Sequence, residues 1–147
     1  MISSDLIKLD MYSAMKSGDK ERVLALRTLL AKLKDYQIKK QEDLTEQDCI
    51  NVIKSMVKQR KEAAEMYQNA NRNKLAEKEK FEIKILNKYL PKIMSKDEHR
   101  ELVKKVVKEI DANSLSDMGK AMSLIIERGG NVINGSTANK ILRELLE

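Results

Sequence analysis

Residues 19–40 read DKERVLALRTLLAKLKDYQIKK, and this stretch decides the class of fold. Its apolar residues recur three or four positions apart, which is the spacing of one face of an α-helix. They are Val23, Leu26, Leu29, Leu30, Leu33 and Tyr36. Asp19 stands where a helix N-cap is expected, and Gly18 before it favours the end of a preceding helix. The stretch therefore predicts one long amphipathic helix over residues 20–40.

The same spacing continues on both sides of this helix. It predicts further helices near residues 4–17, 45–69 and 74–89, and no strand. Pro91 ends the fourth helix, because the residue before a proline avoids the helical conformation.

Three more helices follow Pro91. Ser95 and Glu98 have the spacing of a capping box and open the first of them. We therefore expect an all-α protein, with an N-terminal four-helix domain over residues 1–93 and a small three-helix tail domain over residues 94–147.

Composition and charge limit the possible functions. The chain has 147 residues, of which 41% are hydrophobic, so it can build a core; its net charge is +6. Residues 1–95 carry 20 Lys and Arg against 14 Asp and Glu, whereas residues 96–147 carry nine of each. Such a positive field attracts polyanions such as RNA, or acidic protein surfaces. An ordinary lysine-rich solvated surface is the alternative.

The sequence also predicts a compartment. It has no apolar run of membrane-spanning length, and its first residues lack a secretory pattern. Cys49, its one cysteine, cannot form an internal disulfide. We therefore expect a cytoplasmic protein with no membrane contact.

Two rows of basic residues could follow a phosphate backbone. One row recurs every seven residues on the helix predicted over 20–40, and the other shares one side of the helix predicted over 45–69. Each row could equally be a solvated helix face. Together with an arginine in the polar break near residue 70, the candidate RNA-binding residues are Lys20, Arg27, Lys34, Lys54, Lys58, Lys61 and Arg72.

Charged residues also interrupt two apolar stripes. Arg60 falls within the stripe of the third predicted helix, and Glu79 and Glu82 fall within that of the fourth. A buried charge is costly unless it is paired. We expect an ion pair that fixes the register of the two helices; a polar ligand pocket is the alternative.

The remaining chemistry is sparse. His99 is the one histidine and is expected at the surface, and Cys49 is expected to be a small core residue. One His and one Cys cannot form a zinc site, and no glycine-rich phosphate loop is present. We expect no catalytic residue, no metal and no cofactor. Gly119 inside a predicted helix indicates close packing against another backbone.

Several segments, taken in order, resemble the YqeY family, which is related to the helical and tail region of the B subunit of glutamyl/aspartyl-tRNA amidotransferase. The segments are MK at 15–16, DKER at 19–22, LRTLL at 26–30, KQRKE at 58–62, ANRNKL at 70–75, Glu79 with Glu82, YLP at 89–91, DMGKAM at 117–122 and the final amphipathic helix. In one departure, Asn134-Gly135 replaces the Asp-Gly usual before the last helix. Asn can cap a helix as Asp does.

The resemblance implies an accessory module that binds tRNA or another structured RNA and has no catalysis of its own. It also implies two alternatives: a protein adaptor for an aminoacyl-tRNA synthetase or amidotransferase, and a subunit with carbon–nitrogen ligase activity that uses glutamine as amido donor. The residues do not favour an autonomous ligase, because they offer no activated nucleophile and no ligand set for ATP and magnesium. We expect phosphate contacts from the second and third helices, and shape from the turn at 130–135.

Overall fold

A computed structural model describes residues 2–147. This part of the chain is all-α, as predicted, with two short 3-10 helices (Leu115–Asp117 and Gly130–Val132) and no strand. The α-helices are α1 (Ser4–Ser17), α2 (Lys20–Lys40), α3 (Glu46–Asn69), α4 (Asn73–Asn87), α5 (Lys96–Glu109), α6 (Met118–Gly129) and α7 (Gly135–Leu146). Among the described residues, no helix is long and apolar enough to cross a membrane.

The chain divides into two compact units, an N-terminal unit that ends at Leu90 and a C-terminal unit over Pro91–Glu147. The boundary expected from the sequence lies three residues later, after residue 93. α4 ends at Asn87 rather than at residue 89, because its final turn tightens before the proline. There the N–H of Tyr89 donates to the carbonyl of Leu86, three residues back, at 3.1 Å.

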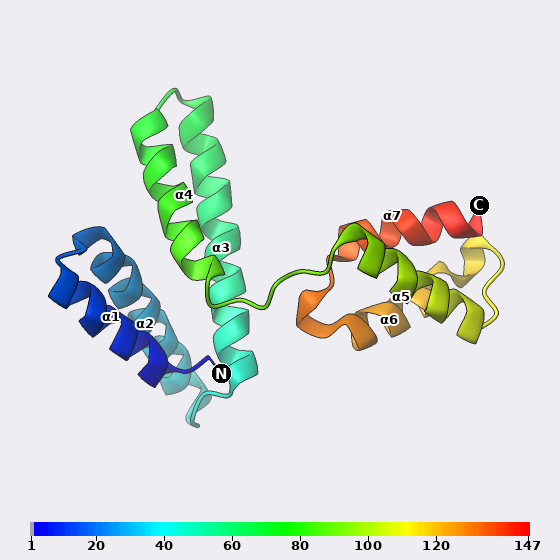
Figure 1. The fold of residues 1–147 in the computed structure, drawn as a ribbon, viewed down its shortest axis with the longest axis horizontal. Helices are drawn as coiled ribbons and strands as arrows, with labels where there is room; N and C mark the ends of the chain where they lie inside the picture. The colour runs from blue at the N-terminus through cyan, green and yellow to red at the C-terminus, as the bar shows by residue number, and fades with distance from the viewer. Residues whose placement is uncertain (1) are drawn as a thin grey trace. The chain divides into compact units, whose positions relative to one another are not determined.

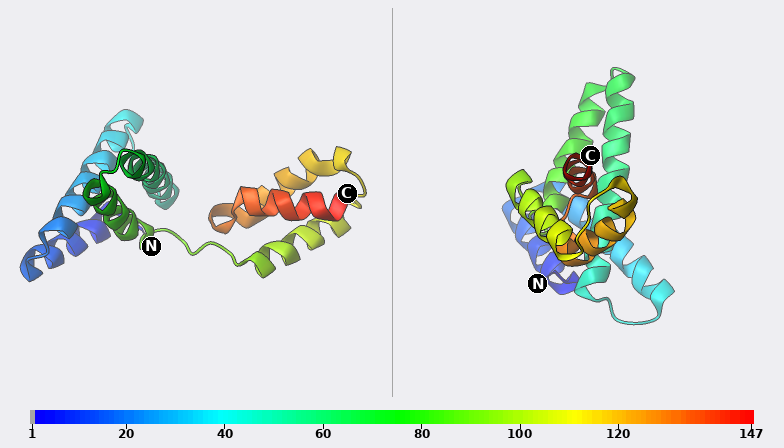
Figure 2. Two further views of the ribbon diagram at one scale, coloured as in Figure 1. Left: turned by 90° about the horizontal axis from the view of Figure 1, so that it is seen from above. Right: turned by 90° about the vertical axis from the view of Figure 1, so that its right-hand side faces the viewer.

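The N-terminal unit consists of two antiparallel helix pairs, α1 with α2 and α3 with α4 (Figure 1). Both further views keep the members of each pair side by side (Figure 2). All four helices contribute to one core, whose buried members include Ile7, Leu26, Leu29, Leu33, Cys49, Ile53, Val57, Ile85 and Leu86. Cys49 is thus a core residue, as predicted.

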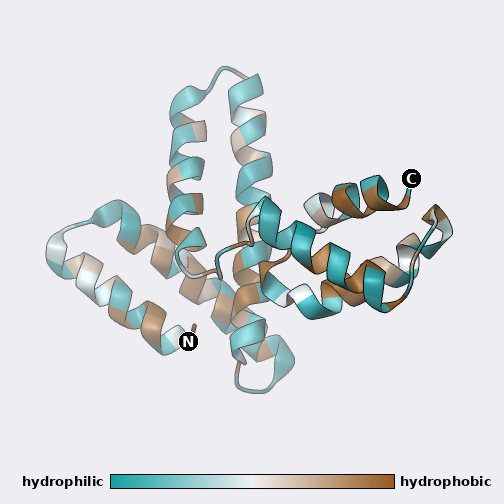
Figure 3. Cartoon of the chain, turned by 45° about the vertical axis from the view of Figure 1, so that its right-hand side comes forward, coloured by the Kyte–Doolittle hydropathy of each residue, from teal (hydrophilic) through white to brown (hydrophobic). Residues whose placement is uncertain are grey.

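The far end of the α3–α4 pair stands away from α1 and α2 (Figure 1). The residues of this far end are largely hydrophilic, whereas hydrophobic residues gather toward the base of the pair (Figure 3). Leu75 lies at this far end and is 40% exposed. Its side chain stays accessible to solvent, because only α3 covers α4 there.

The C-terminal unit packs α5, α6 and α7 around a second core of Val103, Val106, Ala121, Ile125, Ala138, Ile141, Leu142 and Leu146. Asn134 caps α7, since its side chain accepts a hydrogen bond from the Thr137 N–H at 3.1 Å. Asn therefore fills the capping role at this position.

Two glycines of α6 behave differently from each other. A Cβ atom on Gly129 would lie 2.6 Å from the Cβ of Ile133, so the end of the helix needs glycine. A Cβ atom on Gly119 would meet nothing within 4 Å. The close packing predicted for Gly119 is therefore wrong, because this residue lies in the exposed first turn of the helix.

Candidate functional site

The positive charge of the N-terminal unit is concentrated on α2. This helix carries seven Lys and Arg but only two Asp and Glu. Its excess of five equals that of the whole unit, which has 19 Lys and Arg against 14 Asp and Glu. α3 carries four of each and is neutral. α2 is therefore the main source of positive charge in this unit.

Lys20, Arg27 and Lys34 line one side of α2, and all three are exposed. None of them forms an ion pair or a side-chain hydrogen bond with a described residue. The row is thus an unpaired cationic surface, available to an acidic partner.

Lys54, Lys58 and Lys61 share one side of α3, as their spacing requires. Lys58 and Lys61 are exposed, whereas Lys54 is half-buried and already interacts within the protein. Arg72 is exposed in the turn between α3 and α4. This second row rests on a neutral helix, so its field is weaker than that of α2.

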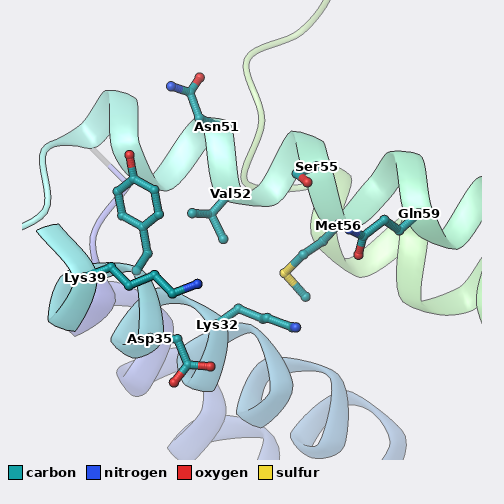
Figure 4. Close-up of a pocket in the computed structure, with 9 residues that line it drawn as sticks. Lys32, Asp35, Lys39, Asn51, Val52, Ser55, Met56 and Gln59 are labelled. Atoms are coloured by element: carbon teal, nitrogen blue, oxygen red, sulfur yellow. The ribbon is translucent and has the colours of Figure 1, made fainter.

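A cleft between α2 and α3 brings together residues that are not among the predicted RNA-binding candidates (Figure 4). Its volume is about 310 Å³. Lys32 and Lys39 extend into it from α2, and Val52 and Met56 point toward them from α3 (Figure 4). The lining residues are Lys32, Asp35, Tyr36, Lys39, Asn51, Val52, Ser55, Met56 and Gln59.

The two lysines of the cleft have no partner within the described chain. Neither Lys32 nor Lys39 forms an ion pair, although Asp35 lies between them in sequence. The cleft therefore offers two free ammonium groups and the carboxylate of Asp35, beside amide and hydroxyl groups and a small apolar floor. Such a mixture suits a phosphate group joined to a flat, partly apolar body.

The cleft lies on a different side of α2 from the predicted row of that helix. Lys32 and Lys39 each follow a member of the α2 row by five residues, which is about 140° around a helix. On α3, by contrast, Lys58 follows the cleft residue Asn51 by seven residues, or about 20°, so the α3 row borders the cleft. The sequence signal that could have found the cleft is the seven-residue separation of Lys32 and Lys39, which repeats the separation in the selected row.

Arg60 lies between Glu79 and Glu82 at the far half of the α3–α4 pair. Its guanidinium donates to Glu79 at 3.1 Å and also to Glu82. Glu82 is only 8% exposed, so the pair is largely desolvated. No cavity among those identified is lined by these three residues. The arrangement holds two helices in register, and its cation is neutralised.

His99 is buried, at 1% exposure, so its expected surface position is wrong. Nδ1 lies 2.8 Å from the carbonyl oxygen of Ser95, and Nε2 accepts the Asn134 N–H at 2.9 Å. Both ring nitrogens are used within the C-terminal unit. The imidazole is thus a structural connector and is not free to act as a base.

A sequence profile of the YqeY family, described as Yqey-like protein, matches residues 4–146. The chain belongs to the YqeY family. The match to the YqeY profile spans all seven α-helices described above.

Three relatives show how far the similarity extends. An uncharacterized protein of Schizosaccharomyces pombe is 31% identical over 86 residues, covering 58% of this chain and 70% of that protein. Altered inheritance of mitochondria protein 41, mitochondrial, of Clavispora lusitaniae is 31% identical over 109 residues, covering 73% of this chain and 64% of that protein. The protein of the same name in Pyrenophora tritici-repentis is 24% identical over 145 residues, covering 95% of this chain and 78% of that protein.

Proposed function

We propose that this YqeY protein is a non-catalytic accessory module that binds RNA, with tRNA as its ligand, through the N-terminal unit. The α2–α3 cleft is the observation that carries the proposal. Two unpaired lysines reach into it from α2, the helix whose charge excess equals that of the whole unit.

The composition of the cleft fits RNA better than it fits a bare anion. Lys32 and Lys39 supply charge for phosphate oxygens, while the side-chain amides of Asn51 and Gln59 can donate to or accept from a base edge. The apolar floor gives an unstacked base a surface to lie on. A protein that binds in this way positions RNA and reads little of its sequence.

The choice of tRNA rests on the family relationship. The related region of the amidotransferase B subunit is expected to hold tRNA while other parts carry out the chemistry. The C-terminal unit has ten Lys and Arg against nine Asp and Glu, so it is nearly neutral. The electrostatic attraction for RNA therefore comes from the N-terminal unit. The cytoplasm is the proposed compartment, although two of the relatives named above are called mitochondrial.

Binding of labelled tRNA to the full chain, measured over a range of salt concentrations, tests the proposal. We expect the reversal Lys32→Glu/Lys39→Glu to weaken binding at least tenfold. The matched control is Lys8→Glu/Lys16→Glu, which makes the same charge change on exposed positions of α1 and should weaken binding much less. Equal loss in both variants would mean that net charge, and not the cleft, governs binding.

The row on α3 has its own test. Reversal of Lys54, Lys58 and Lys61 to Glu should weaken tRNA binding if that side of α3 also contacts the backbone. Unchanged affinity would exclude that side and leave the cleft.

A second candidate function is an adaptor that docks on a synthetase or amidotransferase. It is favoured by exposed apolar residues on α2, among them Leu24 and Ile38, which RNA does not need. Recovery of a protein partner from cells after nuclease treatment supports this function. The third candidate, a ligase subunit, requires glutaminase or ATP-dependent amidation, and turnover by the purified chain alone would overturn the non-catalytic proposal.

A further inference from the structure

One side of α2 carries cationic and apolar residues in strict alternation. The steps between them are four, three, four, three and four residues. The cationic residues therefore recur every seven residues, and so do the apolar ones. We call this side the outer α2 face; its residues are Lys20, Leu24, Arg27, Ala31, Lys34 and Ile38. At 3.6 residues per turn they fall within a sector of about 80°.

The outer α2 face is uncovered along its whole length. All six residues are exposed, with Leu24 at 48% and Ile38 at 64%. At the beginning of the helix, Met15 and Val23 join Leu24 in lining a hollow of about 470 Å³. Burying such regularly spaced apolar side chains against a partner removes them from water, which is favourable in free energy.

The seven-residue repeat specifies the shape of the partner. A second helix laid along α2 presents side chains to the same sector every seven residues, because two helices that coil around each other stay in contact at a 3.5-residue spacing. A β-strand, with its two-residue repeat, cannot keep that register. A phosphate backbone would engage the cations but would leave Leu24 and Ile38 uncovered.

The charges specify the chemistry of the partner. Lys20, Arg27 and Lys34 have no acidic partner among the described residues. A second copy of this chain would place cations against cations, which is unfavourable. A partner helix with Glu or Asp opposite these cations, and with apolar residues opposite Leu24 and Ile38, pairs the charges and also buries the apolar side chains.

We propose that the outer α2 face docks an amphipathic α-helix of another protein, in which acidic and apolar residues alternate with a seven-residue repeat. The occupied length of α2, from Lys20 to Ile38, is about 27 Å, which a partner helix of about five turns would match. The middle of the face lies about 110° around α2 from Lys32 and Lys39, so a helix docked on it does not require RNA binding and leaves these cleft lysines uncovered.

A synthetic peptide tests this directly. The probe is a fluorescein-labelled peptide of four heptads with Leu at one core position, Glu at the other, and Ala and Gln elsewhere. Glu at a core position discourages the peptide from pairing with itself. A control peptide has the same composition with the repeat destroyed by permutation. Binding of each to the full chain is measured by fluorescence anisotropy.

Three variants assign the result to the face. Leu24→Ser/Ile38→Ser removes its apolar contacts, Lys20→Glu/Arg27→Glu/Lys34→Glu reverses its charge, and Lys32→Glu/Lys39→Glu is the control on the other side of α2. All changed positions are exposed, and circular dichroism verifies that each variant stays helical. We expect the repeat peptide to bind at least tenfold more tightly than the permuted one. The first two variants should lose at least tenfold, and the cleft variant should lose much less.

Three results would overturn the proposal. No binding of the repeat peptide would do so, as would equal binding of the permuted peptide or unchanged affinity of Leu24→Ser/Ile38→Ser, since either would reduce the interaction to charge alone. Loss of tRNA binding on charge reversal of the face, with neither ligand affected by Leu24→Ser/Ile38→Ser, would also overturn it and assign the face to RNA. Loss of tRNA binding in the cleft variant alone bears only on the RNA proposal.

Discussion

The Nε2 atom of His99 accepts a hydrogen bond from the backbone N–H of Asn134 at 2.9 Å. Nδ1 of the same ring lies 2.8 Å from the carbonyl oxygen of Ser95. Ser95 caps α5 and Asn134 caps α7, so a single imidazole joins the beginnings of two helices. Because Nε2 accepts an N–H, the ring proton that meets the Ser95 carbonyl oxygen is on Nδ1.

Replacing His99 is therefore expected to weaken the C-terminal unit. His99→Ala leaves the Asn134 N–H without its partner and opens a cavity in a small core, at a cost of about 2–4 kcal/mol. A unit of this size is only marginally stable. Hydrogen exchange followed by mass spectrometry should show faster exchange across residues 91–147 and little change in the N-terminal unit. Glu101→Ala, on the exposed side of α5, is the control; equal exchange in the two variants would contradict the connector role.

This histidine shows where the sequence ceases to predict the structure. Helix positions follow from periodicity and caps, which are local, and α2 and α3 begin within one residue of their expected starts. The partner of His99 lies 35 residues away in the chain. From the local sequence, His99 in the first turn of a helix is expected at the surface. No local pattern reveals that the distant segment at Asn134 covers it.

The candidate site is likewise predictable from the sequence only in part. Lys20, Arg27 and Lys34 could be selected because they form a regular row on one helix. The cleft needs the packing of α2 against α3, which sets Lys32 and Lys39 opposite Val52 and Met56. The helical wheel of α2 alone places these two lysines on a flank but does not say what lies across from them.

Removing the cation of the Arg60 cluster should destabilise the N-terminal unit. Arg60→Met leaves Glu79 and Glu82 facing each other, with Glu82 nearly buried, and we expect a loss of about 2–3 kcal/mol in the free energy of unfolding. Urea denaturation followed by circular dichroism measures it.

The triple change Arg60→Met/Glu79→Gln/Glu82→Leu serves as the control. It removes the uncompensated charge together with the cation, so it should recover most of the loss. A triple variant as unstable as Arg60→Met would show that the ion pair itself, and not the unpaired carboxylates, decides stability.

Tyr89 connects the end of α4 to α1. Its hydroxyl donates to the Asp10 carboxylate at 2.6 Å, and burial followed by this hydrogen bond raises the pKa of Tyr89 above its ordinary value of 10.0. The phenol thus remains a donor throughout the physiological range. Tyr89→Phe should cost about 1–2 kcal/mol, because Asp10 loses its partner at a partly buried site. Under native conditions a protease should then cleave the variant near α1 faster than it cleaves the native chain. An unchanged cleavage pattern would contradict this link.

Asp48 should make the stability of the N-terminal unit depend on pH. Lys40 Nζ lies 2.5 Å from Asp48 Oδ2, and the Thr45 N–H donates to the same oxygen at 2.9 Å. The lysine, then the backbone amide, hold the pKa of Asp48 below its ordinary 3.8. The folded carboxylate therefore binds a proton less readily than the unfolded one. Its stabilisation is complete above pH 3.8 and is lost as the pH falls through the folded pKa.

The matched variant is Asp48→Asn. Its deficit in urea midpoint relative to the native chain should be full at neutral pH and should shrink as the pH is lowered toward about 2. A deficit that stays constant over this range would mean that the carboxylate charge contributes nothing and that the change acts through packing.

The salt dependence of tRNA binding gives the sharpest reading of the cleft. If Lys32 and Lys39 each contact a phosphate, binding by the native chain releases the counterions of both, and the logarithm of affinity falls linearly with the logarithm of salt concentration. Lys32→Ala/Lys39→Ala should reduce the magnitude of that slope by about 1.5–2, as well as lowering affinity. Lys8→Ala/Lys16→Ala, on α1, should leave the slope unchanged. A cleft variant with weaker binding but the native slope would mean that the two lysines act through the shape of the cleft and not through phosphate contact.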